Sequence, residues 1–219
     1  MPKSDLSVAH FKEKGTAWWT REDGTPHDAF VLANLGKKRS GHLLEIGSGR
    51  GAITFKLRDA GWEVAAIDVN REFIVHCKRK KDCSKIEFIH ETADFLPFRD
   101  GVFDSVVSVE VLMHLSDPPR ALKEMSRVLR PGGRVILTFL KKYSYDHIKK
   151  SISVAMGHYE RKYGRGSVDF RYDSIKDIER YIKDTGLSIQ ATSNQYKDNP
   201  CIVLRKGDGG QGPASRYAK

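Results

Sequence analysis

Short apolar runs alternate with amphipathic stretches through the middle of the chain. Residues 43–46 form an apolar run long enough for one buried strand, and residues 52–61 then carry apolar side chains at helical spacing. This alternation predicts a parallel, doubly wound α/β sheet with helices on both faces. Further strands of the alternation are expected over 62–68, from Ile86 to His90, over 104–111 and over 135–139.

Helix starts and stops frame the same pattern. Thr25 is expected as the N-cap of an early helix with Pro26 at its first position, and Asp117 caps a helix that Pro131-Gly132-Gly133 ends. Asp173 or Ser174 caps a later helix. Two last strands, 187–196 and 201–205, then form an antiparallel hairpin that closes the sheet.

The first strand runs directly into a glycine-rich loop, read as LLEIGSGRG from Leu43 to Gly51. Its glycines allow a sharp turn and leave no side chain between the backbone and a ligand. The helix that follows offers unpaired N–H groups at its start. The spacing G-x-G-x-G differs from the G-x-G-x-x-G of dinucleotide-binding folds. The Walker pattern is absent, which disfavours a nucleoside triphosphate.

Polar residues follow the later strands at the edge where open α/β sheets bind ligands. Asp68 ends the second strand, 17 residues after Gly51, where a carboxylate can accept from both hydroxyls of a ribose. The alternative interpretation is that Asp68 caps the helix beginning near Asn70. That helix is expected to turn Phe73, Ile74 and Cys77 toward the core. Glu110 and His114 lie at the C-terminal end of the fourth strand.

The motif E-x-G-x-G-x-G at the end of the first strand resembles motif I of the class I S-adenosylmethionine (SAM) dependent methyltransferases, and in particular the type 11-like domain. The string R-V-L-R-P-G-G before an apolar strand also resembles that family. The resemblance covers about residues 40–140. It implies a mostly parallel, seven-stranded Rossmann-like sheet, SAM as cofactor with S-adenosylhomocysteine as product, and no metal.

The resemblance also implies individual roles. Glu45 lies near the methionine amino group, Asp94 receives the adenine amino group and Phe95 packs on the adenine ring. Trp18 and Trp19 are candidates for a lid over the cofactor, or they only anchor their segment on the core. The full set of implied cofactor contacts is Glu45, Gly47, Ser48, Gly49, Gly51, Asp68, Val69, Asn70, Ala93, Asp94, Phe95, Glu110, Val111, Trp18 and Trp19.

The implied reaction is direct in-line displacement at the methyl group of SAM, in which the enzyme mainly positions the nucleophile. His114 is the first candidate for a base, since it follows the fourth strand and imidazole titrates near neutrality. The alternative is that His114 packs against the cofactor or orients the loop. The expected acceptor is an oxygen or nitrogen atom of a small molecule, because no nucleic-acid module is visible.

Composition leaves other functions open. The chain has 38 basic and 28 acidic residues, a net charge of +10, with basic residues in short clusters such as Lys78–Lys81. Solvated helix ends explain these clusters, while RNA or protein methylation is the alternative. A SAM-fold binding protein without activity and a dehydrogenase are further alternatives. Cys77, Cys83 and Cys201 form no C-x-x-C pair and indicate reduced thiols in a cytoplasmic protein, and no membrane segment is expected.

We expect three parts along the chain. Residues 1–39 form an N-terminal helical segment or lid, and residues 40–206 form the SAM-binding domain. Within that domain, 141–172 is an aromatic-rich insertion that covers the substrate. Residues 207–219 are a glycine-rich, disordered tail.

Overall fold

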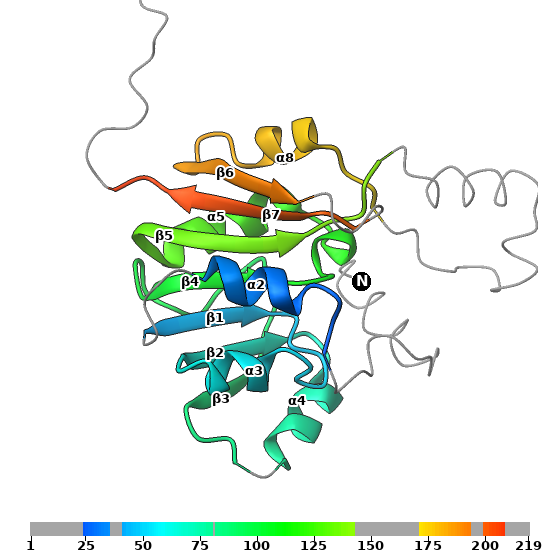
Figure 1. Ribbon diagram of the computed structural model, residues 1–219, viewed down its shortest axis with the longest axis vertical. Coiled ribbons are helices and arrows are strands. Elements are labelled where there is room, and N and C mark those ends of the chain that lie inside the picture. Colours follow the sequence, from blue (N-terminus) through cyan, green and yellow to red (C-terminus); the bar gives the residue numbers. More distant parts are fainter. Residues whose placement is uncertain (1–23, 36–40, 81, 143–170, 194–198, 209–219) are drawn as a thin grey trace, which may run out of the picture.

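Seven strands form one sheet in a computed structural model that describes residues 24–35, 41–80, 82–142, 171–193 and 199–208. The strand order is β3-β2-β1-β4-β5-β7-β6 (Figure 1). Strands β1 to β5 pair in parallel, whereas β7 is antiparallel to both β5 and β6. The bounds are β1 His42–Ile46, β2 Glu63–Asp68, β3 Ile86–His90, β4 Phe103–Ser108, β5 Leu129–Thr138, β6 Leu187–Ser193 and β7 Cys201–Lys206. The predicted fold class, a mostly parallel seven-stranded Rossmann-like sheet, is confirmed.

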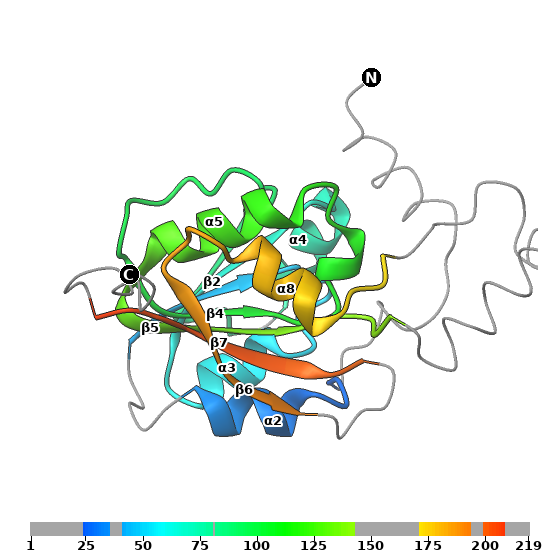
Figure 2. The ribbon, with the colours of Figure 1, turned by 90° about the horizontal axis from the view of Figure 1, so that it is seen from above.

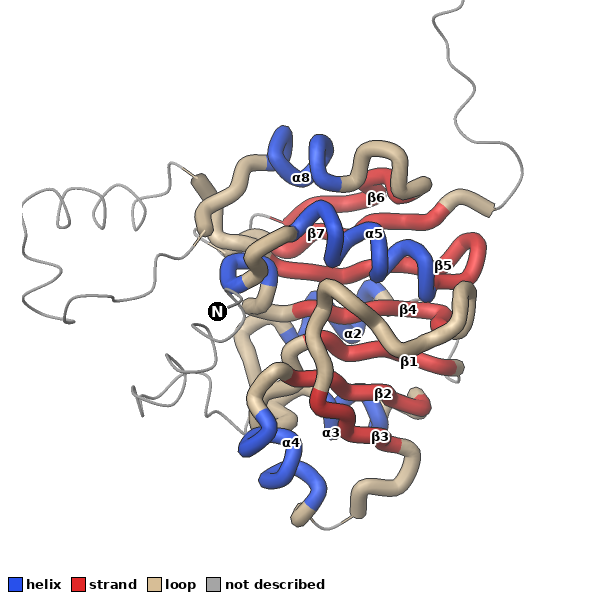
Figure 3. Tube along the Cα trace, turned by 180° about the vertical axis from the view of Figure 1, so that it is seen from behind, coloured by secondary structure: helices blue, strands red, loops and turns tan. Residues whose placement is uncertain are grey.

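Helices cover both faces of the sheet. Helices α2 and α3 lie on one face (Figure 1), and α5 and α8 lie on the opposite face (Figure 3). The view from above shows these layers with the sheet between them (Figure 2). The bounds are α2 Asp28–Asn34, α3 Thr54–Asp59, α4 Arg71–Lys78, the 3₁₀ helix η1 Leu112–His114, α5 Pro118–Val128 and α8 Ile175–Tyr181.

The alternation of side chains along each strand divides the core into two parts. Leu43 of β1 packs with Val31 of α2 and Leu57 of α3, whereas its neighbour Leu44 packs with Met125 of α5. Successive strand residues point to opposite faces, so a continuous apolar run serves both layers. Ile74 and Cys77 of α4 belong to the same cluster as α2 and α3.

Several helix starts follow the predicted caps. The Asp117 carboxylate accepts the N–H of Arg120 at 3.1 Å at the start of α5. Ser174 caps α8 in a reciprocal capping box with Asp177. Polar side chains placed before an apolar helical pattern therefore mark these boundaries correctly.

The predicted start of the first helix is wrong. Helix α2 begins at Asp28 with His27 in the N-cap position, not with Thr25 and Pro26. The Thr25 hydroxyl donates to Asp28 Oδ1 at 2.6 Å and accepts the N–H of His27 at 3.2 Å. Because these bonds close a turn ahead of the helix, Thr25 lies before the first helical turn.

Two predicted strand boundaries also change. Pro131-Gly132-Gly133 does not separate a helix from a strand, since β5 starts at Leu129 directly after α5 and runs through all three residues. An irregularity in the pairing with β4 accommodates them, and Gly132 has a φ of 73°. Strand β4 ends at Ser108, earlier than predicted, because the backbone turns out of the extended conformation at Glu110, where φ is 59°.

Some predictions concern residues that the structure does not describe. The lid residues Trp18 and Trp19, nearly all of the cover over 141–172 and the tail beyond 208 lie outside the described ranges. The three-part division of the chain stays a prediction. In the described residues, no helix is long and apolar enough to cross a membrane.

Candidate cofactor and substrate pocket

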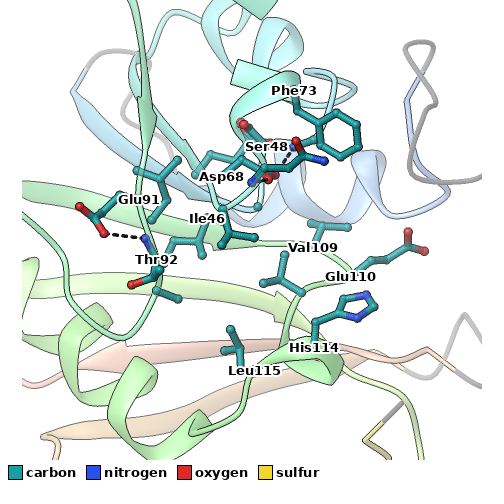
Figure 4. A pocket seen from close by; sticks show the side chains of 18 of the residues that line it. Ile46, Ser48, Asp68, Phe73, Glu91, Thr92, Val109, Glu110, His114 and Leu115 are labelled. Atoms are coloured by element: carbon teal, nitrogen blue, oxygen red, sulfur yellow. Dashed lines mark hydrogen bonds between the residues drawn. The ribbon is translucent and has the colours of Figure 1, made fainter. Parts of the chain in front are cut away.

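A pocket opens at the carboxyl ends of β1, β2 and β4 (Figure 4). The pocket forms at this edge of the sheet because the parallel strands end side by side there. Figure 4 shows Ser48, Asp68 and Phe73 together in one part of the pocket and Glu110 with His114 in another. The lining residues are Thr25, Glu45–Arg50, Ala52, Ile53, Ile67–Asn70, Phe73, Glu91–Asp94, Val109–Val111 and His114–Ser116.

The glycine loop forms the floor of this pocket. The N–H groups of Gly47 and Ser48 both donate to the carbonyl of Ile67, at 2.8 and 3.0 Å. Gly47 has a φ of 77°, and a Cβ added there would collide with the side chain of Val111. Glycine is therefore required at this position both for its conformation and for the close approach of the loop after β4. Gly51, a predicted contact, is not among the residues that line the pocket.

Asp68 connects the loop to the end of β2. Its Oδ2 accepts the N–H of Gly49 at 2.8 Å, and its Oδ1 accepts the N–H of Asn70 at 2.7 Å. Burial raises the pKa of this carboxyl against the opposing effect of these two bonds. The alternative role as helix N-cap is wrong, since Asn70 caps α4 by accepting the N–H of Glu72 at 2.9 Å. Asp68 thus holds the glycine loop in shape while lining the pocket.

Glu45 is a buried carboxyl group at the base of the loop. It is 2% exposed, and its Oε2 has no hydrogen-bond partner among the described residues. Burial raises its pKa to about 8, with smaller contributions in the same direction from Asp68 and Asp28 that the Thr54 side chain opposes. A buried acceptor of this kind favours a ligand that brings a hydrogen-bond donor or a positive charge.

The residues after β3 form a second wall. Ala93 and Asp94 line the pocket, and Asp94 Oδ1 is buried without a hydrogen-bond partner in the described part of the chain. Burial raises the pKa of this carboxyl, and nearby Asp117 adds to the effect. Phe95 differs from its predicted role, since it is 65% exposed and outside the lining residues.

The loop after β4 forms the third wall and carries Glu110, Val111 and His114. The N–H of Glu110 donates to Thr138 Oγ1 at 2.7 Å, which fixes the turn out of β4. The N–H of His114 donates to the carbonyl of Val111 at 2.8 Å and closes the 3₁₀ turn. Both predicted polar residues of this loop therefore reach the same pocket as the glycine loop.

The structure adds lining residues that the sequence reasoning missed. Phe73 was expected to face the core but lines the pocket, and the guanidinium of Arg50 lies 6.0 Å from the centre of its ring. Thr25, just before α2, also reaches the pocket. Arg50 lies inside the glycine motif, and that position could have identified it as a pocket residue. No such signal existed for Phe73, because an apolar residue at its position also fits the core-facing side of α4.

Acidic side chains outnumber basic ones among the lining residues, although the chain as a whole carries a net charge of +10. The lining carboxyl groups are those of Glu45, Asp68, Glu91, Asp94 and Glu110. Arg50 is the one lysine or arginine among the lining residues that the structure describes. Such a pocket favours a cationic ligand over an anionic one. No cluster of three or more potential metal ligands occurs in the described residues.

Residues 44–137 match the family model described as a methyltransferase domain. The chain is 32% identical over 132 residues to a ubiquinone/menaquinone biosynthesis C-methyltransferase of Hahella chejuensis, covering 57% of this chain and 53% of that protein. It is 31% identical over 121 residues to a malonyl-[acyl-carrier protein] O-methyltransferase of Pseudescherichia vulneris, covering 55% and 47%. The chain spans about half the length of the curated relatives it matches.

Solved structures share the fold. A crystal structure of a SAM-dependent methyltransferase from Methanosarcina mazei superposes with a TM-score of 0.65 at 23% identity, over 84% of this chain and 99% of that chain. At this identity the likeness establishes the fold alone. Together with the family match, it confirms the resemblance to the class I, SAM-dependent methyltransferases that the sequence motifs indicated.

Proposed function

We infer that the protein transfers a methyl group from SAM to a small organic acceptor. The inference starts from residues 44–137, which match a methyltransferase domain. The observation that carries the proposal is the acidic pocket built around the glycine loop. SAM has a sulfonium and an ammonium group against one carboxylate, so it is a net cation. An acid-lined pocket in a basic protein fits this charge.

The residues present fit the cofactor group by group. Glu45 offers a buried carboxyl oxygen without a hydrogen-bond partner in the described residues, suited to the ammonium group, which would favour its ionised form. Asp94 offers a second such oxygen on the wall after β3, suited to the adenine amino group. Asp68 keeps acceptor capacity for ribose hydroxyls, since an ionised carboxylate has about four lone-pair sites and two are used.

The same features disfavour a dinucleotide. In a phosphate-binding loop, backbone N–H groups point at the ligand and the helix start favours negative charge. Here the N–H of Gly49 is taken by the Asp68 carboxylate at 2.8 Å. A pyrophosphate would meet that carboxylate in place of a free donor. This argues against the dehydrogenase alternative independently of the G-x-G-x-G spacing.

When bound, SAM supplies a methyl group already activated by its sulfonium. The work left to this chain is to orient the acceptor in line with the methyl group and to keep water out. Three apolar lining residues on the β4 side, Val109, Val111 and Leu115, are suited to excluding water. His114 remains a candidate base in this scheme, as the sequence suggested.

We propose a small molecule rather than a nucleic acid as the acceptor. An RNA backbone at the reaction centre would face the carboxyl groups that line the pocket, and like charges would repel. The acceptor atom is proposed as oxygen or nitrogen. Relatives whose names specify C- and O-methylation make carbon the competing outcome of the assay. We keep a cytoplasmic location as a proposal, supported by three cysteines that are free thiols.

Calorimetric titration of the purified chain with SAM tests the cofactor assignment. Asp68→Asn should weaken SAM binding about 10- to 100-fold, because it removes charge-assisted hydrogen bonds that contribute about 1.5–3 kcal/mol. Asp59→Asn, on the exposed end of α3, is the matched control and should leave the affinity unchanged. Binding of a nicotinamide dinucleotide in place of SAM would refute the proposal.

Transfer of a labelled methyl group from SAM tests the acceptor class. The purified protein is incubated with a cell extract divided into small molecules, RNA and protein. Label in the small-molecule fraction, with the methylated atom identified by mass spectrometry and NMR, would support the proposal. Label in RNA that nuclease treatment releases would establish the alternative, and a steep fall of binding with salt would accompany it.

A further inference from the structure

A polar cluster adjoins the β4 wall of the pocket, and three of its four residues are outside the expected cofactor contacts. It consists of His27 before α2, Glu110 after β4, Asn199 just before β7 and Cys201 at the first position of β7. His27 is 2% exposed and Cys201 is fully buried. Of these four residues only Glu110 lines the pocket, so its carboxylate is the group by which the cluster reaches the pocket.

Contacts within the cluster converge on that carboxylate. Asn199 Nδ2 lies 3.4 Å from Glu110 Oε1 and 3.2 Å from His27 Nε2. His27 Nε2 lies 3.7 Å from the same Glu110 oxygen, and His27 Nδ1 lies 3.4 Å from Cys201 Sγ. Burial raises the pKa of the Cys201 thiol to about 12, so that group stays protonated and Glu110 is the one acidic member of the cluster that faces the pocket.

The backbone at Glu110 has a conformation that residues other than glycine rarely adopt. Its φ is 59°, and its N–H donates to Thr138 Oγ1, a fully buried residue at the end of β5. A strained conformation of this kind persists only where the surroundings fix it. Here Thr138 at the end of β5, His27 before α2 and Asn199 before β7 all contact Glu110.

The position of Glu110 separates it from the proposed cofactor contacts. Those contacts lie at the ends of β1, β2 and β3, whereas Glu110 follows β4 and contacts Asn199, just before β7, the strand on the far side of β5. Figure 4 likewise shows Glu110 beside His114 and apart from Asp68 and Ser48. The space on the β4 side is therefore available for the second ligand of the reaction.

We propose that Glu110 contacts the methyl acceptor rather than the cofactor, with His27 and Asn199 as positioning residues, and that the acceptor is a neutral or cationic molecule with an O–H or N–H at the methylated atom. The proposal rests on the proposed function and replaces the cofactor role that the family resemblance implied for Glu110. An anionic acceptor is disfavoured because Glu110 and the other lining carboxyl groups would repel it.

The lone pair of the acceptor oxygen or nitrogen forms a bond to the methyl carbon, and the bond between that carbon and sulfur breaks. Its electron pair stays on sulfur, which becomes a neutral thioether. The acceptor loses its proton to the Glu110 carboxylate. His27 and Asn199 hold the carboxylate at Oε1, so the proton is proposed to go to Oε2, and the carboxyl then returns it to water.

Glu110→Gln tests the assignment by separating two readouts. SAM affinity measured by calorimetry should stay within about twofold of wild type, while methyl transfer to the small-molecule extract should fall at least about 100-fold, as for loss of a general base. Glu179→Gln, on the exposed face of α8, is the matched control for both readouts. A loss of SAM affinity as large as that of Asp68→Asn, or unchanged transfer, would overturn the proposal. Failure of the wild type to bind SAM would instead refute the proposed function.

Two further measurements address the positioning residues and the acceptor class. His27→Phe should reduce transfer without changing SAM affinity, and His27→Gln, which places a polar amide near the position of Nε2, should recover part of it. Equal losses in both variants would indicate a merely structural role and count against positioning. Separation of the labelled product by ion exchange at neutral pH should give a neutral or cationic compound. A product that an anion exchanger retains would overturn the proposed acceptor class.

Discussion

The buried Glu45 carboxyl should make the protein less stable as pH rises, and Glu45→Gln should remove that dependence. Its pKa of about 8 in the folded chain compares with 4.5 for an ordinary glutamate. Between these values the folded state holds a proton that the unfolded chain has lost. Stability therefore falls as pH rises from 4.5 to 8 and is level outside that window.

The magnitude follows from the same two values. Each pH unit within the window corresponds to about 1.4 kcal/mol, so the interval from pH 5 to pH 8 amounts to about 4 kcal/mol. Glutamine has nearly the shape of protonated glutamate and does not titrate. The difference in unfolding free energy between Glu45→Gln and wild type should therefore move in favour of the variant by about 4 kcal/mol from pH 5 to pH 8.5.

Urea denaturation of both proteins at pH 5 and pH 8.5 measures this difference. Glu179→Gln on the exposed face of α8 is the control, and its unfolding free energy should parallel that of wild type. Parallel behaviour of Glu45→Gln and wild type would refute the reasoning, because the carboxyl would then ionise freely in the folded state. If the cofactor's ammonium group contacts Glu45, SAM binding should also strengthen as pH rises toward 8.

Two further predictions concern local structure. Gly47→Ala and Gly101→Ala both place a side chain at positive φ, which costs about 1–2 kcal/mol, but only a Cβ at Gly47 meets another residue, Val111. Gly47→Ala should therefore lose more stability than Gly101→Ala in urea denaturation and weaken SAM binding, and equal effects would contradict the packing argument. Ser174→Ala should lower stability by about 1 kcal/mol through loss of the capping box, whereas Lys176→Ala in the same exposed turn should change little. If Ser174→Ala lost no more stability than Lys176→Ala, the capping box would not stabilise α8, and packing alone would hold the helix.

The sequence indicated the elements that depend on neighbouring residues. Apolar runs bounded by glycine located β1 and β2, and polar residues before apolar periodicity located the starts of α5 and α8. The position of Asp68 beside the glycine loop was predictable in the same way. Neighbouring strands of a parallel sheet end at the same edge, so the end of β2 lies next to the loop that follows β1.

Predictions failed where a boundary or an orientation depends on distant residues. The apolar face of α4 included Phe73, and periodicity does not distinguish a side chain that packs in the core from one that borders a pocket. Thr25 fits an N-cap as well as the turn it forms, and the carboxylate of Asp28 decides between them. Pro131-Gly132-Gly133 reads as a loop, yet pairing with β4 and β7 draws the flanking residues into one strand.

The sequence by itself determined the order of strands and helices, the glycine loop and the acids that follow the strands, because these features are set by contacts within a few residues. Only the tertiary structure decided which of these residues share a pocket and what their protonation states are. The raised pKa of Glu45 arises from burial by α2, α3 and the loop, and the Glu110 cluster joins residues 89 positions apart in the chain. Burial and such long-range contacts exist only once the sheet has assembled, so the chemistry of this pocket is a property of the fold.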